Sequence, residues 1–266
     1  MTQEEKAQRF RELHHGPPIL VLPNAWDVAT AKVFESAGFP AIATTSAGVA
    51  FSLGYADGER ISQDEMLGVV ARIARAVSVP VTADVESGYG DPVATAKAVV
   101  AAGAIGMNLE DVRGEDAETL ADLDAQCRII REIAALHLPL VINARTDIFL
   151  AQVGDPTTRL ERTIKRLNAF REAGADSLFA PGVRDRETIA ALARGVRGPL
   201  NILATPGTPS IADLQALGVA RVSTGSGLSR AALALVRRMA NDLSQGSYDS
   251  MFADQIPYAE VNRMLG

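Results

Sequence analysis

The sequence has one cysteine, Cys127, in 266 residues, and few aromatic side chains. A single cysteine excludes an internal disulfide and a cysteine-rich metal site, and it is typical of a reducing compartment. In place of aromatics the chain carries many Ala, Val, Leu and Ile residues, which bring the hydrophobic fraction to 47%. This aliphatic composition suits the buried strands of a parallel sheet.

The sequence also lacks any run of Lys or Arg, and its net charge is -6. A polyanion would find no attractive field here, so we expect no nucleic acid partner. No apolar stretch approaches the roughly eighteen residues that cross a membrane, and residues 1–13 are polar and charged rather than signal-like. We therefore expect a cytoplasmic protein without a membrane partner.

Short aliphatic runs alternate with amphipathic stretches along the whole chain. Eight runs predict strands: 19–22, 41–45, 80–84, 105–109, 140–144, 177–180, 200–203 and 221–223. Between and after them, helical periodicity predicts helices over 27–37, 63–77, 92–102, 120–136, 157–173, 185–193 and 210–217. Glycines such as Gly38, Gly103 and Gly174 end several of these helices. The pattern is typical of repeated βα units.

The count of eight strands favours an α/β fold of the (β/α)8 TIM barrel type. A doubly wound sheet shows the same alternation, but its Gly-x-Gly-x-x-Gly turn does not follow the first strand, where Pro23-Asn24-Ala25-Trp26 stands instead. No linker divides the chain, which predicts a single domain over residues 1–266. Residues 231–266 exceed what eight repeats need and predict a C-terminal helical extension, either folded on its own barrel or exchanged with a neighbouring subunit.

Carboxylates follow two neighbouring strands of the predicted barrel. Asp84 and Glu86 end the third strand, and Glu110 ends the fourth. Catalytic groups of such barrels come from these strand ends. Three acids together would repel one another unless a cation neutralises them, and hard oxygen ligands without histidine indicate Mg²⁺ or Mn²⁺. The alternative is that the acids cap helices or pair with Arg113 and Arg145.

Two further strand ends carry groups that suit an anion. Arg145, after the fifth strand, could grip a substrate carboxylate with two hydrogen bonds. The alternative is a salt bridge to Glu110, and the two roles are compatible. The turn Thr45-Ser46-Ala47-Gly48 after the second strand offers hydroxyl and backbone N–H donors. An ordinary turn remains the alternative reading of that segment.

Together these motifs resemble the isocitrate lyase and phosphoenolpyruvate mutase superfamily, over about residues 20–227. The resemblance is carried by residues 23–31, by 45–48 with 52–54, by Asp84-Val85-Glu86-Ser87-Gly88-Tyr89-Gly90, by 108–111 and by 143–147. It implies that Asp84 binds the metal directly while Glu86 and Glu110 hold its waters. It also implies that a small 2-oxo acid chelates the metal and that its enolate is the reacting species.

The resemblance assigns further roles around the substrate. Thr45, Ser46 and Ala47, with Arg145, would grip the substrate carboxylate, and Asp84 would approach the substrate through the metal. Trp26 would pack beside the substrate, although a large aromatic at a barrel mouth is as often part of the core. Asp57 matches a catalytic aspartate on a mobile gating loop of the family, while the Asp57-Gly58 pair is also ordinary turn chemistry.

The chain departs from the lyase branch at two places. That branch carries a Lys-Lys-Cys-Gly-His loop after the fourth strand, where this chain has residues 112–117 with no cysteine. Cys127 lies within a predicted helix, and a buried structural thiol is the better interpretation. The sixth strand ends in Phe179-Ala180-Pro181-Gly182, where lyases of the family usually offer a glutamate.

The sequence thus predicts a Mg²⁺-dependent carbon–carbon lyase for a small di- or tricarboxylic acid such as isocitrate, methylisocitrate or an oxaloacetate-like acid. A phosphonate mutase or hydrolase is one alternative, and a non-catalytic 2-oxo acid binder is another. Relatives in the superfamily commonly form homo-oligomers, and the extension after Arg230 is compatible with a dimer or tetramer.

Overall fold

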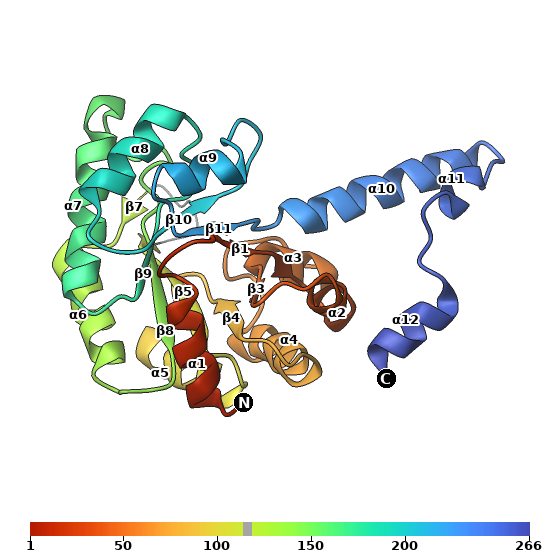
Figure 1. Cartoon of the computed structure of the whole chain (residues 1–266), viewed down its shortest axis with the longest axis horizontal. Helices are drawn as coiled ribbons and strands as arrows, with labels where there is room; N and C mark the ends of the chain where they lie inside the picture. Colours follow the sequence, from red (N-terminus) through yellow and green to blue (C-terminus); the bar gives the residue numbers. More distant parts are fainter. Residues whose placement is uncertain (114–118) are drawn as a thin grey trace.

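The computed structural model describes residues 1–113 and 119–266 and shows an α/β barrel with parallel strands (Figure 1). All eight predicted strands are present. They are β1 (Leu20–Leu22), continued by β2 (Asn24–Ala25), β3 (Ile42–Thr44), β4 (Val81–Asp84), β5 (Gly106–Glu110), β8 (Val141–Arg145), β9 (Ser177–Phe179), β10 (Leu200–Leu203) and β11 (Arg221–Ser223). A separate antiparallel pair joins β6 (Val112–Arg113) to β7 (Thr119–Leu120).

The ring closes through the first strand, which Pro23 divides into two. Below the proline, β1 pairs with β11, with Leu20 opposite Arg221. Above it, β2 pairs with β3, with Asn24 opposite Ala43. Proline has no N–H to donate, so the ladder is interrupted at Pro23, while the Pro23 carbonyl still accepts from the Ala43 N–H at 2.9 Å. The nine-strand order from β1 to β2 therefore describes a closed eight-stranded barrel.

The predicted helices also appear, with ends that differ by a few residues. They are α2 (Val28–Ser36), α4 (Gln63–Ala76), α5 (Pro92–Ala101), α6 (Leu123–Ala134), α7 (Arg159–Glu172), which follows a short 3₁₀ turn at Pro156–Thr158, α8 (Arg186–Gly195) and α9 (Ile211–Ala216). Two helices had no sequence prediction, α1 (Gln3–Glu12) and α3 (Ser46–Ser52). Helix α1 buries only Ala7 and Phe10, so its apolar face is too short to be recognised from periodicity.

Side chains alternate between the two faces of the barrel wall, as the strand geometry requires. Ala83, Met107, Ile142 and Val222 belong to the large core between strands and helices. Their strand neighbours face the barrel interior. At the N-terminal end of the barrel a second core joins strand residues to Ala7 and Phe10, so that α1 closes this end.

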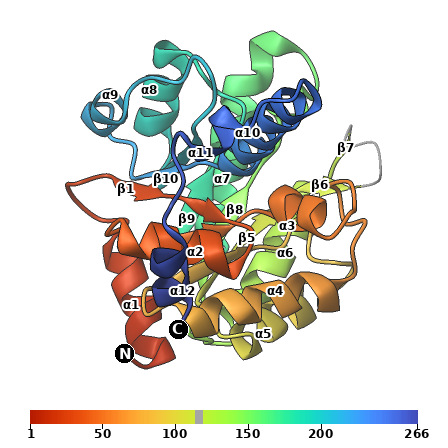
Figure 2. The ribbon, with the colours of Figure 1, turned by 90° about the vertical axis from the view of Figure 1, so that its right-hand side faces the viewer.

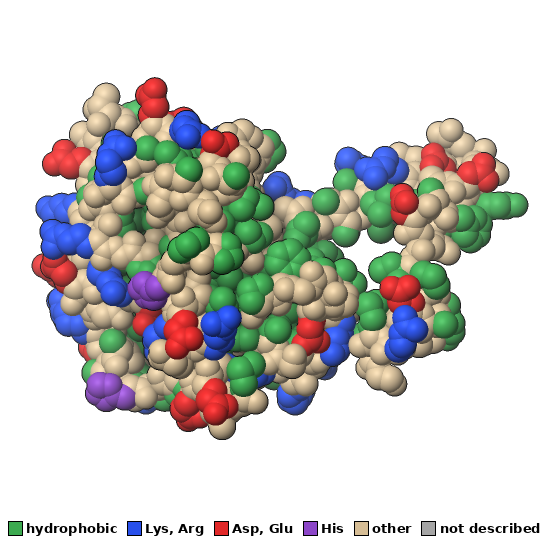
Figure 3. All heavy atoms as spheres, in the orientation of Figure 1, with side chains coloured by type: hydrophobic (Ala, Val, Ile, Leu, Met, Phe, Trp, Pro, Cys, Tyr) green, Lys and Arg blue, Asp and Glu red, His purple; other side chains and the backbone are tan. Residues whose placement is uncertain are grey.

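The C-terminal extension leaves the barrel at α10 (Gly227–Ser244), turns at α11 (Asp249–Phe252) and ends in α12 (Tyr258–Leu265). Figures 1 and 2 show α10 projecting from the barrel and the chain returning, so that α12 lies near α2. Figure 3 shows hydrophobic side chains along this extension. Across the described residues, no helix combines the length and the apolar character that crossing a membrane requires.

Candidate active site

A cavity of about 290 Å³ lies at the C-terminal ends of the barrel strands. This is the end at which barrels of this kind carry their catalytic groups. Side chains or backbone from the following residues line the cavity: Asn24, Thr45, Ser46, Ala47, Asp57, Asp84, Asn108, Arg145, Leu150, Phe179, Pro181, Leu203, Thr205, Ser223, Gly225, Ser226 and Arg230.

Asp84, the last residue of β4, is held by donors from the start of α3 and from β5. Its Oδ2 accepts from the backbone N–H of Ser46 at 3.2 Å and from the Ser46 hydroxyl at 3.0 Å. Its Oδ1 accepts from the Asn108 side-chain amide at 3.2 Å. The backbone N–H of Asp84 donates to Thr44 Oγ1 at 3.0 Å. These bonds fix the carboxylate in one orientation at the edge of the cavity.

The turn at residues 45–48 forms the start of α3. Thr45 is the N-cap residue, and its hydroxyl accepts from the Gly48 N–H at 3.4 Å. A Cβ on Gly48 would lie 2.5 Å from Thr45 Cγ2 and 3.0 Å from Trp26 Cβ. The close approach of these side chains therefore requires glycine.

Arg145, at the end of β8, lies between two carboxylates. Its Nη1 is 2.7 Å from Glu110 Oε2, while Nε and Nη2 contact the two oxygens of Asp147 at 2.5 and 2.7 Å. Its guanidinium also stacks over Phe179 at 5.8 Å from the ring centre. Burial lowers the pKa of Arg145, but the charges of Asp147 and Glu110 outweigh burial and raise it well above its usual value. The guanidinium is therefore fixed and permanently charged.

A second ion pair, between Asp111 and Arg166, supports the contact of Arg145 with Asp147. The fully buried Asp111 accepts from Arg166 Nε at 2.7 Å and from the backbone N–H of Asp147 at 3.0 Å. The pair thus fixes the backbone of Asp147, whose carboxylate in turn orients Arg145. Asp147 and Asp111 lie in the motifs quoted from the sequence, but their positioning role was not predicted.

Acidic side chains gather around Asp84. Burial, followed by the charges of Asp84 and Asp57, raises the pKa of Glu86 to about 7. Burial and Asp84 likewise raise the pKa of Asp57. The Tyr89 hydroxyl donates to Glu86 at 3.4 Å. Glu86 and Asp57 therefore resist ionisation at this site, which is the electrostatic situation that a bound cation relieves.

The acids do not form a ready cluster of direct metal ligands. Within the residues that the structure describes, no three His, Cys, Asp or Glu side chains converge as an ion would need. Burial raises the pKa of Glu110, against the attraction of Arg145, with which Glu110 forms its ion pair. An arrangement with Asp84 as direct ligand and the glutamates farther out is compatible with this geometry, because it needs only one carboxylate at the ion.

The structure brings most of the predicted site residues together. Thr45, Ser46, Ala47, Asp57, Asp84 and Arg145 all line the cavity. Glu86 and Glu110 are not among the lining residues, although Glu110 pairs with Arg145, which is. Trp26 packs instead beside a small core that includes Val49 and Met66, and it is not among the lining residues.

Sequence reasoning missed the far wall of the cavity. Leu150, Phe179, Pro181 and Leu203 supply an apolar surface, and Arg230, near the start of α10, supplies a second cation. The turn Ser223-Thr224-Gly225-Ser226 after the last strand was the available signal for this part of the site.

The structure describes part of the segments in which the sequence departs from the lyase branch. Cys127 is buried in α6, and burial raises the pKa of its thiol, as a structural cysteine requires. Of the segment that replaces the Lys-Lys-Cys-Gly-His loop, residues 114–117 lie outside the described part of the chain. The end of β9 places Phe179 and Pro181, and no acid, against the cavity.

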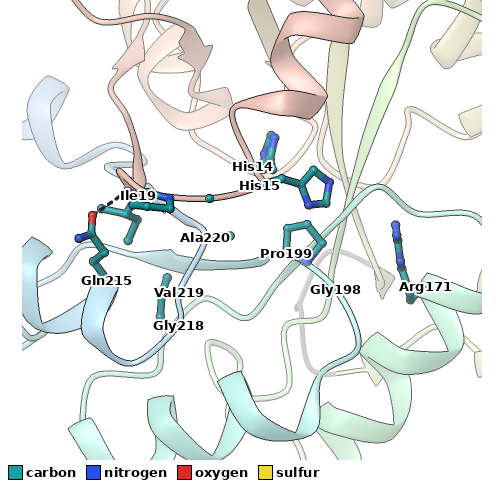
Figure 4. A pocket seen from close by; sticks show the side chains of 12 residues that line it. His14, His15, Ile19, Arg171, Gly198, Pro199, Gln215, Gly218, Val219 and Ala220 are labelled. Atoms are coloured by element: carbon teal, nitrogen blue, oxygen red, sulfur yellow. Dashed lines mark hydrogen bonds between the residues drawn. The ribbon is translucent and has the colours of Figure 1, made fainter.

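A larger cavity, of about 670 Å³, lies at the opposite end of the barrel. Figure 4 shows His14, His15, Pro199 and Arg171 on one side of it and Ile19, Gln215 and Val219 on the other. It contains none of the residues that the sequence singled out. The smaller cavity is the better candidate for chemistry, because the carboxylates and Arg145 meet there.

A family model described as phosphoenolpyruvate phosphomutase matches residues 10–244 of the chain. Among solved structures, the chain is similar to a protein of Burkholderia cenocepacia J2315 whose lyase or mutase activity is assigned only provisionally. The two are 39% identical with a TM-score of 0.90, and the match covers 98% of this chain and 95% of the other.

Curated relatives include proteins both with and without an assigned activity. An uncharacterised protein of Mycobacterium tuberculosis is 38% identical over 96% of this chain and 95% of its own length. The 2-methylisocitrate lyase of Halalkalibacterium halodurans is 27% identical, covering 88% of this chain and 76% of the lyase. Oxaloacetate decarboxylase 2 of Pseudomonas fluorescens is 28% identical, covering 80% of this chain and 74% of the decarboxylase.

Proposed function

Because the chain belongs to the phosphoenolpyruvate phosphomutase family, within the isocitrate lyase and phosphoenolpyruvate mutase superfamily, we propose that it is a Mg²⁺-dependent carbon–carbon lyase. Its substrate would be a small di- or tricarboxylic acid that yields the enolate of a 2-oxo acid. Relatives named as 2-methylisocitrate lyase and oxaloacetate decarboxylase support the choice of reaction.

One observation carries the proposal, the meeting of Arg145 with a set of mutually repelling carboxylates at one small cavity. Arg145 keeps N–H donors beyond those used by Glu110 and Asp147, since a guanidinium has five. Those donors can hold a substrate carboxylate with the charge-assisted bonds for which arginine is suited. The volume of about 290 Å³ is at the low end for a ligand pocket and favours a small acid.

Asp84 would hold the cation directly, with Glu86 and Glu110 behind it. The bound cation would supply positive charge to the oxygen atoms on which the enolate develops. Ser46 and Asn108 hold the Asp84 carboxylate in place before any ligand arrives. A preorganised carboxylate costs no rearrangement at the moment of reaction.

The lining of the cavity favours the lyase over the phosphonate alternative. Of the described residues that line it, Arg145 and Arg230 are the only cations, whereas a phosphonate carries more charge than one carboxylate. The apolar surface formed by Leu150, Phe179 and Leu203 suits the carbon skeleton of a substituted dicarboxylic acid. We therefore propose an acid with a hydrocarbon portion as the substrate.

The test is Mg²⁺-dependent turnover of isocitrate, 2-methylisocitrate, oxaloacetate and phosphonopyruvate in one panel. We expect one of the three carboxylic acids to be consumed and Asp84→Asn to abolish the reaction. Arg145→Lys should reduce kcat/KM about 100-fold or more, because lysine cannot make the paired bonds. Arg11→Lys is the matched control, since Arg11 forms an ion pair with Asp176 away from the cavity.

The other outcomes assign the alternatives. Consumption of phosphonopyruvate alone would move the chain to the mutase or hydrolase branch. Turnover of none of the acids, together with Mg²⁺-dependent binding of a 2-oxo acid, would identify a non-catalytic binder. Turnover that Asp84→Asn leaves intact would contradict the proposed metal site.

We further propose that the chain works as a homo-oligomer, a dimer or tetramer, in the cytoplasm. Helix α10 has 18 residues and buries only Ser229, while Leu233, Val236 and Leu243 are exposed along it. Nine of the fifteen exposed large hydrophobic side chains fall within residues 231–266. An apolar surface of this kind is typical of a protein interface, and a second copy of the chain is its proposed partner.

A further inference from the structure

Arg221 is the largest fully buried side chain of the described chain, with an exposed fraction of 0%. It lies on β11, next to Val222, which faces the outer core between strands and helices. Because neighbouring strand residues point to opposite faces, Arg221 points into the barrel. Most arginines lie at protein surfaces, and buried ones are normally paired with an acid.

Arg221 has no such acid. Its Nε donates to the Ser223 hydroxyl at 3.0 Å, and its Nη2 donates to Asn108 Oδ1 at 3.4 Å. The guanidinium stacks on Phe10, which enters the barrel from α1, at 5.9 Å from the ring centre. Its Nη1 has no partner, and among the described residues no carboxylate lies within ion-pair distance of it.

The charge of Arg221 persists despite its burial. Burial lowers its pKa to about 9, partly opposed by Asp84, so the guanidinium is still protonated at neutral pH. The nearby His14 is neutral, since burial and the charge of Arg221 lower its pKa to about 3. The barrel interior therefore contains a fixed positive charge that has no ion-pair partner among the described residues.

Asn108 connects this charge to the candidate metal ligand. Its side-chain oxygen accepts from Arg221 and, at 2.7 Å, from Asn143, while its NH₂ group donates to Asp84 at 3.2 Å. The oxygen thus faces two donors and the nitrogen faces an acceptor, which fixes the amide orientation. Asp84 and Arg221 bind opposite ends of one amide dipole.

An unpaired buried cation lowers the stability of the folded state, and an apolar residue of similar size would often be better tolerated. Residues kept in such positions are candidates for a functional role. Through Asn108, Arg221 is connected to Asp84, a charged group of the cavity. The positive charge of Arg221 weakens the attraction of the site for a cation and strengthens its attraction for an anion.

We propose that Arg221 is a positioning residue of the active site, a fixed positive charge beneath the cavity that orients Asp84 through Asn108 and favours the negative charge developing on the substrate. The inference rests on the proposed function and extends it to a residue outside the cavity lining. Arg221 lowers the affinity of the site for Mg²⁺ and raises the affinity of the Mg²⁺-loaded site for an enolate-like anion.

The test measures two affinities by calorimetry, that for Mg²⁺ alone and that for oxalate at saturating Mg²⁺. Oxalate is a planar dianion that resembles the enolate of a 2-oxo acid. In Arg221→Gln we expect Mg²⁺ to bind roughly three- to tenfold more tightly and oxalate to bind more weakly by a similar factor. Arg221→Lys keeps the charge and should leave both affinities within about twofold of the native values. Arg194→Gln, on the exposed face of α8, removes the same charge far from the cavity and should change neither.

The opposite directions separate this role from a structural one, because a distorted site would lose affinity for both ligands. Equal losses of both affinities in Arg221→Gln, or no change in either, would overturn the inference. The proposed function would still stand in that case, provided that the native protein binds Mg²⁺ and oxalate. Failure of the native protein to bind Mg²⁺ or oxalate would overturn both. Arg221→Met is a second neutral variant. If neither neutral variant folds while Arg221→Lys does, Arg221 is a folding requirement and the proposal is wrong.

Discussion

Glu59 and Glu86 join two loops at the mouth of the barrel. The Glu59 N–H donates to Glu86 Oε2 at 2.8 Å, and the Glu59 carboxylate accepts from the N–H and hydroxyl of Ser87 and from the N–H of Tyr89 at 2.8 to 3.0 Å. Both glutamates have positive φ angles, 54° and 51°. Non-glycine residues adopt this conformation at a cost, and such strain is common at functional sites. The contact holds the segment of Asp57 against the end of β4.

Replacing Glu59 by alanine should release this segment. The backbone N–H groups of Ser87 and Tyr89 lose a charged acceptor, which is worth on the order of 1–3 kcal/mol. We expect the exchange of these two amides with deuterium to accelerate about 10- to 100-fold. Glu65→Ala is the control, since Glu65 caps α4 without contacting either amide. Unchanged exchange at Ser87 and Tyr89 would show that the contact does not hold the loop.

The raised pKa of Glu86 predicts how stability depends on pH in the absence of divalent cations. The folded state binds the proton up to about pH 7, whereas the unfolded chain releases it near pH 4.5. This contribution to stability is present below about pH 4.5 and is lost as the pH rises through about 7. It amounts to about 3 kcal/mol at most.

Thermal unfolding in EDTA at a series of pH values measures this loss. Glu86→Gln should flatten the decline between pH 5 and 7.5, because the amide does not titrate. Adding Mg²⁺ should raise Tm more at pH 8 than at pH 5, since the ionised carboxylates bind the ion. A variant that declines as steeply as the native protein would exclude Glu86 as the cause.

Two Gly→Ala changes should have opposite effects. In Gly48→Ala the new methyl group would lie 2.5 Å from Thr45 Cγ2, so the turn beside Asp84 must move. We expect a loss of about 1–3 kcal/mol in the free energy of unfolding. Gly68→Ala, on the exposed face of α4 with no atom near the added methyl, should stabilise by about 0.5–1 kcal/mol. Denaturant unfolding of both variants measures the difference, and equal effects would contradict the packing argument.

The exposed face of α10 should govern the oligomeric state. Val236→Glu places a charge on the apolar surface that we propose as an interface, and burying an unpaired charge is unfavourable. We expect light scattering to report a smaller assembly than that of the native protein. Asn241→Glu adds the same charge at an exposed polar position of the helix and should leave the mass unchanged. A native protein that is already monomeric would contradict the proposed interface.

The sequence predicted the barrel because strand and helix periodicities are local signals. The eight aliphatic runs became the eight strands, and Asp84 and Arg145 were placed at the correct end because parallel strands end together. Helix α3 was missed because it has only seven residues, of which the first five, Ser46 to Ala50, are buried, so it shows no amphipathic period. The predicted turn at Thr45–Ser46 instead became its N-terminus.

Contacts between distant segments were beyond the sequence. Arg221 was read as part of a strand, because no local pattern shows that it points into the barrel at Asn108. Arg230 was read as the start of the extension, yet it lines the cavity. Arg221 contacts Asn108, which lies more than a hundred positions earlier in the sequence. Arg230 meets the other lining residues only after the ring has closed.

The division of the first strand at Pro23 also bears on how the chain folds. Leu20 is opposite Arg221, about two hundred residues later in the sequence, so the ring cannot close until β11 is available. Contacts of such long sequence separation form slowly, because a long loop must first be closed. During synthesis the first strand therefore waits with one edge unpaired while every other strand can find its earlier neighbour. The last strand of the ring, β11, completes the barrel by pairing with both β1 and β10. Until then the open edges of β1 and β10 are both exposed to wrong pairing and aggregation.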